Sequence, residues 1–348
     1  MKTVDRILEA LARRGSATGT ALAKELQITR QAVSRHLKAL VRDGRVVKSG
    51  ETRGAAYTLP GPGKSLPSGV RAAKTLTLEG LQEDRVFNRL SRELNLEGRL
   101  SSPALVTCRY AFTEMLNNAI DHSKAAEGWV VLECDTHEVR FEVRDRGIGV
   151  FDSIASRFGL EDEMEAIGEL LKGKATTMAD RHSGEGIFFT SRAGDKFSLR
   201  SHGVEIVFEG HGKDVRLERR RYQEGTQVQF ALSRRSRTRL EDIFLAFAPE
   251  EFDYRFERSL VNVTVALEDC VSRSQAKRLV SRLESFKEVI LDFKGVQSVG
   301  QAFCDEVFRV FLSRHPECRL RIRDLDQTLR VMVLHAVDKT TKHRLTFD

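Results

Sequence analysis

Three polar residues in the stretch YAFTEMLNNAIDHS are spaced so that together they could bind a metal ion. Glu114, Asn118 and Asp121 stand at i, i+4 and i+7, so on a helix they would share one stripe. An ordinary solvated helix face carries Lys and Glu in mixed order. This stripe instead offers carboxylate and carboxamide oxygens, which suit a hard cation such as Mg²⁺. For the stretch taken alone, a polar surface strip is the more common explanation.

The same stretch carries apolar residues that predict the helix needed to position these groups. They recur every three to five positions, as on the buried face of an amphipathic helix. They are Tyr110, Phe112, Met115, Leu116, Ala119 and Ile120. A helical segment, EDRVFNRLSREL, precedes this helix, and two β-like runs, WVVLEC and EVRFEVRD, follow it.

Two glycine-containing motifs follow the helix. The second β-like run ends in DRGIG (residues 145–149), which places a carboxylate beside a backbone that a flat ligand can approach closely. Further on, HSGEGIFF (residues 182–189) is a small-residue turn that opens a helix, where free N–H groups and the helix dipole favour phosphate. The segment between them, GKATTMADRH, has the composition of a mobile lid. Each motif alone is weak.

Together and in this order, the three motifs resemble the GHKL ATPase family of gyrase B subunits, Hsp90, MutL, histidine kinases and anti-sigma-factor kinases. The resemblance covers about residues 75–235 and implies an ATP-binding domain that uses Mg²⁺. It implies that Asn118 holds Mg²⁺ and phosphate oxygens and that Asp145 accepts from the adenine amino group. Glu114 would polarise a water or a substrate hydroxyl. The other implied ATP contacts are Asn117, Asp121, Gly147, Gly149, Lys174, Thr176, His182, Gly184 and Gly186.

The chain departs from two branches of that family. It lacks the H-E dipeptide on a dimerisation helix that histidine kinases phosphorylate, and His122 lies inside the nucleotide motif. It also lacks the long second domain that carries the catalytic lysine in gyrase or MutL. The anti-sigma-factor kinases are closest in size. The strands KFSLRS, VEIVFEG and TQVQFAL are expected to complete an α/β sandwich.

The N-terminal end of the chain is basic. Residues 1–64 contain 13 Lys and Arg against 5 Asp and Glu, a net charge of +8, whereas the whole chain carries +7. Such an asymmetry predicts a nucleic-acid-binding end attached to a near-neutral body. Apolar periodicity predicts three helices here, the third with Thr29 as its N-cap, followed by the strand-like pieces RVVKS and AAYTL.

The segment TRQAVSRHLKALVRDGRVVK resembles winged helix-turn-helix transcription regulators of bacteria over the recognition helix and first wing strand. The resemblance implies that Arg30, Gln31, Ser34 and Arg35 face the major groove of DNA, and that Lys48 and Arg53 meet phosphates. A helical protein-interaction module is the alternative, and the basic excess favours DNA.

Strands and helices alternate from about residue 237 and predict a small α/β domain. The stretch VILDFKGVQSVGQAFCDEVF resembles STAS domains, the fold of anti-anti-sigma factors, and in particular the STAS-like domain that follows GHKL ATPases in some bacterial proteins. Anti-anti-sigma factors carry a phosphorylatable serine at the start of the helix. The matching residues here, 300–302, have no hydroxyl, and Ser298 lies in the preceding loop. The resemblance implies a built-in partner that binds the ATPase domain, with Asp305 and Glu306 on a polar docking face.

The expected architecture is therefore multidomain α/β. It comprises a winged helix (1–60), a proline- and glycine-rich linker (61–74), a GHKL domain (75–235) and a STAS-like domain (236–348). The longest apolar runs are too short to span a membrane. Five scattered cysteines indicate reduced thiols in a cytoplasmic protein and argue against a zinc site.

The sequence supports three functional interpretations. The first is an ATP-dependent DNA-binding regulator, in which Mg-ATP controls the STAS-like domain and the DNA reader. The second is a serine/threonine kinase acting on a protein partner or on its own C-terminus, with Glu114 as the base. The third is a nucleotide-sensing scaffold that barely hydrolyses ATP. GHKL ATPases and winged helices both often dimerise, so a homodimer is a further hypothesis.

Overall fold

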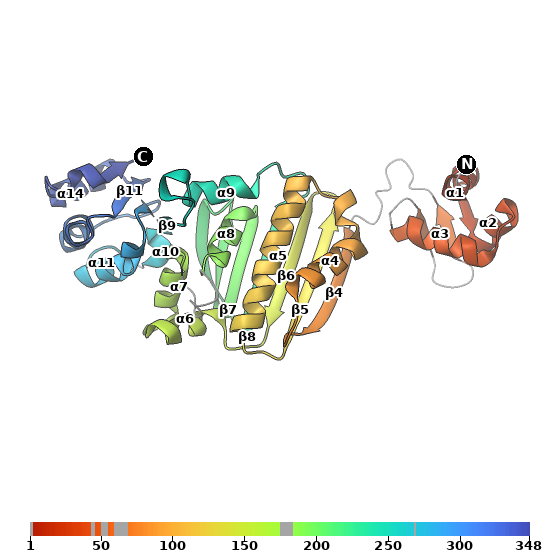
Figure 1. Ribbon diagram of the computed structural model, residues 1–348, viewed down its shortest axis with the longest axis horizontal. Coiled ribbons are helices and arrows are strands. Elements are labelled where there is room, and N and C mark those ends of the chain that lie inside the picture. The colour runs from red at the N-terminus through yellow and green to blue at the C-terminus, as the bar shows by residue number, and fades with distance from the viewer. Residues whose placement is uncertain (1–2, 43–45, 50–54, 59–68, 175–183, 268) are drawn as a thin grey trace.

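The computed structural model describes residues 3–42, 46–49, 55–58, 69–174, 184–267 and 269–348 (Figure 1). Three separate sheets organise them. One belongs to the N-terminal unit, a five-stranded antiparallel sheet forms the centre, and a four-stranded parallel sheet lies near the C-terminus. In the described part of the chain, no helix is long and apolar enough to cross a bilayer.

The N-terminal unit has the predicted helices and a small sheet. Its helices are α1 (Thr3–Arg14), α2 (Gly19–Leu26) and α3 (Arg30–Arg42), and its strands are β1 (Ser16–Thr18), β2 (Val47–Ser49) and β3 (Ala56–Thr58), in the order β1-β3-β2. The Thr29 hydroxyl accepts from the N–H of Ala32 at 3.2 Å, as expected of an N-cap. The unit has a hydrophobic core of its own, which includes Leu22, Val33 and Leu37.

The central sheet has the strand order β4-β5-β6-β8-β7. Its strands are β4 (Gly69–Thr77), β5 (Glu127–Asp135), β6 (Glu138–Asp145), β7 (Lys196–Glu209) and β8 (Asp214–Ser233). One face is covered by α4 (Glu83–Leu94), α5 (Ser102–His122) and α8 (Gly186–Ala193), as Figure 1 shows. Phe112 of α5 meets Phe141 of β6 edge-on at 5.3 Å, and Phe141 stacks on Phe230 of β8 at 5.0 Å. These rings fix the long helix against the sheet.

Three features of this domain differ from the sequence prediction. The last six residues of the predicted linker, 69–74, lie in β4 and pair with β5, because Ala72 and its neighbours complete the sheet edge. The three short strands expected after residue 195 are two long ones, β7 and β8, with an irregular register around His202. Two helices between the glycine motifs, α6 (Val150–Phe158) and α7 (Glu163–Lys172), were not predicted.

The C-terminal region begins with α9 (Leu240–Phe247) and builds a parallel sheet in the order β12-β11-β10-β9. Its strands are β9 (Arg258–Asn262), β10 (Glu288–Asp292), β11 (Arg319–Arg323) and β12 (Leu345–Phe347), and its helices are α10 (Val263–Ala266), α11 (Arg273–Val280), α12 (Gln301–Cys304), α13 (Leu312–Arg314) and α14 (Gln327–Ala336). A π-helical segment, Asp305–Phe311, joins α12 to α13. The strand predicted over residues 259–267 ends at Asn262, where α10 begins.

The predicted docking face on this domain is only partly exposed. Glu306 is buried, and both Glu306 and Asp305 pair with Arg273 of α11, at 3.4 and 3.1 Å. These two carboxylates therefore stabilise the domain internally. Ser298 is exposed in the loop before α12.

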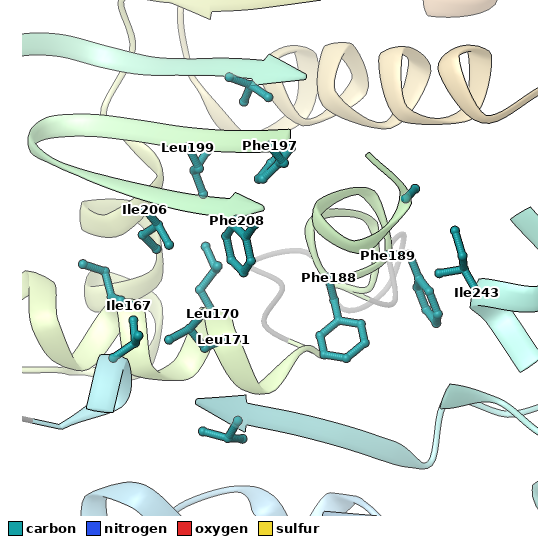
Figure 2. Close-up of a cluster of buried hydrophobic side chains, with 14 of the residues drawn as sticks. Ile167, Leu170, Leu171, Phe188, Phe189, Phe197, Leu199, Ile206, Phe208 and Ile243 are labelled. Carbon is teal, nitrogen blue, oxygen red and sulfur yellow. The ribbon is translucent and has the colours of Figure 1, made fainter. Parts of the chain in front are cut away.

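The central and C-terminal domains share one continuous hydrophobic core. Figure 2 shows Ile167, Leu170 and Leu171 of α7 beside Ile206 and Phe208 of β7, with Phe188 and Phe189 of α8 near Ile243 of α9. Phe188 also packs against Phe256, just before β9, with ring centroids 4.6 Å apart. Side chains of α7 and α8 pack in the core that the two domains share. A displacement of either helix would therefore change the packing of both domains.

Candidate nucleotide site and DNA-facing surface

A cavity of about 240 Å³ opens between α5, the turn after β6, α6 and the N-terminus of α8. Its polar lining comes from Glu114, Asn117, Asn118, His122, Ser123, Asp145, Ser153, Glu185 and Thr226. Its apolar lining includes Met115, Ile154, Leu199 and Val228. A largely apolar pocket with a few converging polar groups is the usual form of a small-molecule site.

Asp145 is held rigidly at the end of β6. Its Oδ1 accepts from the backbone N–H of Gly147 at 2.8 Å and of Thr226 at 3.2 Å. Both of these bonds use the same oxygen, so within the described part of the chain Oδ2 can accept from a ligand. The side chain is only 4% exposed, and burial raises the pKa of the carboxyl above its ordinary value although the two N–H bonds oppose the shift.

The two glycines of the DRGIG turn have different structural roles. A Cβ on Gly147 would lie 1.8 Å from the carbonyl oxygen of Ser123, to which Ile148 N–H donates at 2.9 Å. Gly147 therefore lets the turn pack on the end of α5. Gly149 has φ +80°, a conformation that favours glycine, and it lines the cavity. A side chain at Gly149 would strike Ser201 and His202 of β7.

Glu114 lies against the first residue of α8. A Cβ on Gly186 would come within 2.3 Å of Glu114 Oε2, so the absence of a side chain there leaves room for the carboxylate. Asn118 follows Glu114 by one helical turn, and both side chains are half-buried in the cavity wall. This space, lined by carboxylate and carboxamide oxygens beside a helix N-terminus, fits Mg²⁺ bound to a nucleotide phosphate.

The structure therefore brings most of the predicted nucleotide residues together. Glu114, Asn117, Asn118, Asp145, Gly149, Gly184 and Gly186 all line the cavity. Asp121, Gly147 and Lys174 do not. Asp121 lies on α5 between the lining residues Ala119 and His122 but is not part of the wall, and Gly147 has the packing role described above. Thr176 and His182, with most of the predicted lid, lie outside the described residues.

Lys174 points to a different partner from the one predicted. Its Nζ donates to the carbonyl oxygen of Ser285 at 2.8 Å and lies 4.3 Å from the centre of the Phe286 ring. Both belong to the C-terminal domain. The resemblance to GHKL ATPases implied that Lys174 contacts ATP, but its side chain bonds the C-terminal domain and does not line the cavity.

Thr226 and Ser153 were missed by the sequence prediction. Thr226 begins the TQVQFAL run of β8, where its N–H bonds Asp145 and its hydroxyl accepts from Val150 N–H at 3.0 Å. It thus ties the two ends of the DRGIG turn to a strand about 80 residues further along the chain. The only signal in the sequence was a small polar residue at a strand start.

A second candidate surface lies on α3. Arg30, Gln31, Ser34 and Arg35 are all exposed and line one shallow groove, together with Lys38. Opposite them, Val33, Leu37 and Leu40 are buried. Lys48 on β2 is exposed, whereas Arg53 lies outside the described residues. A basic, solvent-facing helix side of this kind suits the major groove of DNA.

Three regions of the chain match family models. Residues 6–54 match the MarR family, residues 105–236 match the histidine kinase-, DNA gyrase B- and HSP90-like ATPases, and residues 275–330 match a STAS-like domain of unknown function. The predicted order of a winged helix, a GHKL-type domain and a STAS-like domain is confirmed. The fold class is confirmed with it, and the matches support an ATPase or kinase family and a DNA-binding family at that coarse level. No curated protein matches the chain.

Proposed function

We propose that this protein is an ATP-responsive DNA-binding regulator in which the nucleotide cavity controls the STAS-like domain through α8 and α7. ATP with Mg²⁺ would occupy the cavity beside Glu114 and Asn118. Asp145 would accept from the adenine amino group, since its carboxylate is already fixed by two backbone N–H groups. Mg²⁺ would offset the charge of the phosphate oxygens.

The observation that carries this proposal is the double attachment of α8. Its N-terminal residue, Gly186, lines the cavity, and Arg192 lies near its other end. Arg192 is buried, and its guanidinium donates to the carbonyl oxygen of Leu260 in β9 at 3.2 Å. An eight-residue helix is about 12 Å long. One rigid element therefore touches both the cavity and the C-terminal sheet.

The end of α7 gives a second connection. Lys172 is buried, and its Nζ donates to Glu169 Oε1 at 2.6 Å and to the carbonyl oxygens of Arg278 and Ser281 at 2.9 and 2.8 Å. The Ser259 hydroxyl of β9 in turn donates to the Lys172 carbonyl at 2.5 Å. These bonds join the last turn of α7 to the C-terminal end of α11.

Phosphate binding would act on α8 because negative charge is stabilised at a helix N-terminus. An effect on the C-terminal domain requires that ATP bind two arrangements of α8 with different affinity. The altered position of α8 would change the STAS-like domain. That change would in turn alter DNA binding by the exposed face of α3.

Hydrogen exchange followed by mass spectrometry tests the coupling. Mg-ATP is expected to change exchange in β9 and α11 of the full-length protein, and Asn118→Ala is expected to abolish the change by weakening ATP binding. Arg192→Met removes the bond to Leu260, so it should retain ATP binding and lose the response in β9. A circular dichroism spectrum checks that the variant is folded. Equal responses in Arg192→Met and the wild type would refute the proposed route.

The kinase alternative is supported by the position of Glu114 in the cavity and by the exposed Ser298 hydroxyl on the C-terminal domain. Incubation with γ-labelled ATP and Mg²⁺ separates the candidates when free phosphate and protein-bound label are followed together. The regulator proposal predicts free phosphate without labelled protein, lost in Glu114→Ala. Label on the protein would establish a kinase. ATP binding with neither product would leave a nucleotide-sensing scaffold.

A further inference from the structure

Outside the cavity lining, three side chains from different elements converge on one point. They are Asp152 of α6, Glu163 of α7 and His202 of β7, and each offers a ligand atom within 4.8 Å of the other two. His202 Nδ1 lies 3.6 Å from Asp152 Oδ2 and 3.5 Å from Glu163 Oε1. We propose that these three residues form a binding site for a divalent transition metal, with Zn²⁺ the best fit.

The spacing matches metal ligands better than hydrogen-bond partners. An N–H···O hydrogen bond spans about 2.7–3.2 Å, so both imidazole-to-carboxylate distances are too long for one. Zinc binds imidazole nitrogen at about 2.0–2.1 Å and carboxylate oxygen at about 2.0–2.2 Å. Two such ligands on a tetrahedron are separated by about 3.3–3.5 Å. The nitrogen thus stands at nearly this distance from both oxygens.

The imidazole ring is held in this orientation by its surroundings. It stacks on Tyr222 of β8 with the ring planes 6° apart and centroids at 5.3 Å. On another side, Gly149 leaves the space that the ring occupies, since a Cβ there would lie 2.7 Å from His202 Cε1. The tautomer with its proton on Nε2 leaves the Nδ1 lone pair facing both carboxylates. A ligand fixed in advance loses little entropy when it binds a metal.

The donor set selects the class of cation. Two carboxylates and a neutral imidazole balance a dication, and imidazole nitrogen favours zinc and its neighbours over Mg²⁺, which prefers oxygen alone. The site contains no cysteine, and all five cysteines are buried elsewhere. The argument against a zinc site, which rested on the cysteine spacing, therefore does not apply to these three residues. The Asp152 side chain is 58% exposed, which gives an ion access from solvent and leaves a fourth position for water.

The bound metal would join α6, α7 and the irregular part of β7 beside the nucleotide cavity. Gly149 and Ser153, next to these ligands in space and sequence, line that cavity. The site is distinct from the Mg²⁺ position beside Asn118, and its existence does not depend on ATP hydrolysis or DNA binding.

Calorimetric titration of the full-length, chelator-treated protein with ZnCl₂ in the absence of nucleotide tests the proposal. One ion per chain is expected. His202→Ala and Asp152→Asn should each weaken the binding at least about tenfold. The matched control is His211→Ala, because His211 lies just after the last residue of β7 with a single carboxylate, Asp195, at 3.3 Å. Its affinity for zinc should equal that of the wild type.

A thermal shift gives an independent measurement, since a ligand that binds the folded state raises its unfolding temperature. ZnCl₂ should raise the unfolding temperature of the wild type and of His211→Ala, but not of Glu163→Gln. This third variant keeps the assay informative if His202→Ala fails to fold. Unchanged zinc affinity in all three ligand variants, or no stoichiometric binding by the wild type, would overturn the proposal. In the latter case His202 would only be a neighbour of the two carboxylates.

Discussion

Lys172→Met is expected to destabilise the joint between the central and C-terminal domains. Methionine keeps the length of the side chain but removes the ammonium, which donates three hydrogen bonds in the wild type. Glu169, 7% exposed, loses its closest partner, and two carbonyl oxygens lose their donor. Breaking a buried ion pair by removing one partner costs about 3–5 kcal/mol.

A second positive charge near Glu169 places the expected loss of stability at the low end of that range. Arg282 Nε remains 3.7 Å from Glu169 Oε2 and offsets part of the uncompensated charge. We therefore expect a decrease of about 3 kcal/mol in the free energy of unfolding. For a folded unit of about 150–250 residues, that corresponds to a fall of about 6–12 °C in Tm. Glu169→Leu together with Lys172→Met should recover most of the loss, because two apolar groups then replace the pair.

Urea unfolding followed by fluorescence is the assay. The single tryptophan, Trp129, lies on β5 and reports on the central sheet. Lys174→Met is the matched control: it also removes a lysine bond to the C-terminal domain, but the contact is at the surface, so the loss should stay below about 1 kcal/mol. A Lys172→Met midpoint equal to that of the wild type, or a double variant as unstable as the single losses summed, would refute the reasoning.

The other predictions concern the cavity and the DNA-facing surface. Gly147→Ala should lower the free energy of unfolding, measured by chemical denaturation, by about 3 kcal/mol, since the added Cβ would meet backbone atoms. The added Cβ of Gly186→Ala meets only a flexible carboxylate, so its loss should stay within about 1 kcal/mol. Equal losses in the two variants would contradict this expectation. Burial raises the pKa of Asp145 above 3.8, so its contribution to stability is greatest below that pH and is lost as pH rises through the folded pKa. Asp145→Asn cannot ionise, so its free energy of unfolding relative to that of the wild type should rise as the pH increases above 3.8, and a difference that does not change with pH would argue against the shift. Lys48→Ala should reduce the slope of log DNA affinity against log salt by about 1 in anisotropy titrations, while Arg14→Ala, already paired with Glu25 at 2.7 Å, should leave it unchanged.

The order of the three domains and most residues of the candidate nucleotide site could be predicted from local sequence patterns. Helix α5 could be predicted because its apolar and polar stripes follow the helical period, and Asp145 because it ends a clear strand. The recognition helix could be predicted because its cap, its buried face and its basic face are all local features. Helical periodicity and turn-forming residues depend on neighbouring positions in the chain. The elements they specify can therefore be predicted without knowing which other elements pack against them.

Contacts between residues far apart in the chain could not be predicted from local patterns. Thr226 reaches Asp145 because β6 and β8 are neighbours in the sheet, an order that no local pattern encodes. Lys174 was expected to contact ATP, yet its side chain bonds the C-terminal domain. His202 lies between two predicted strands in the sequence, and the register of β7 with β8 and the positions of α6 and α7 bring it to two carboxylates. Long-range pairing and packing set these contacts, because side chains from separate elements must share one space in a close-packed interior.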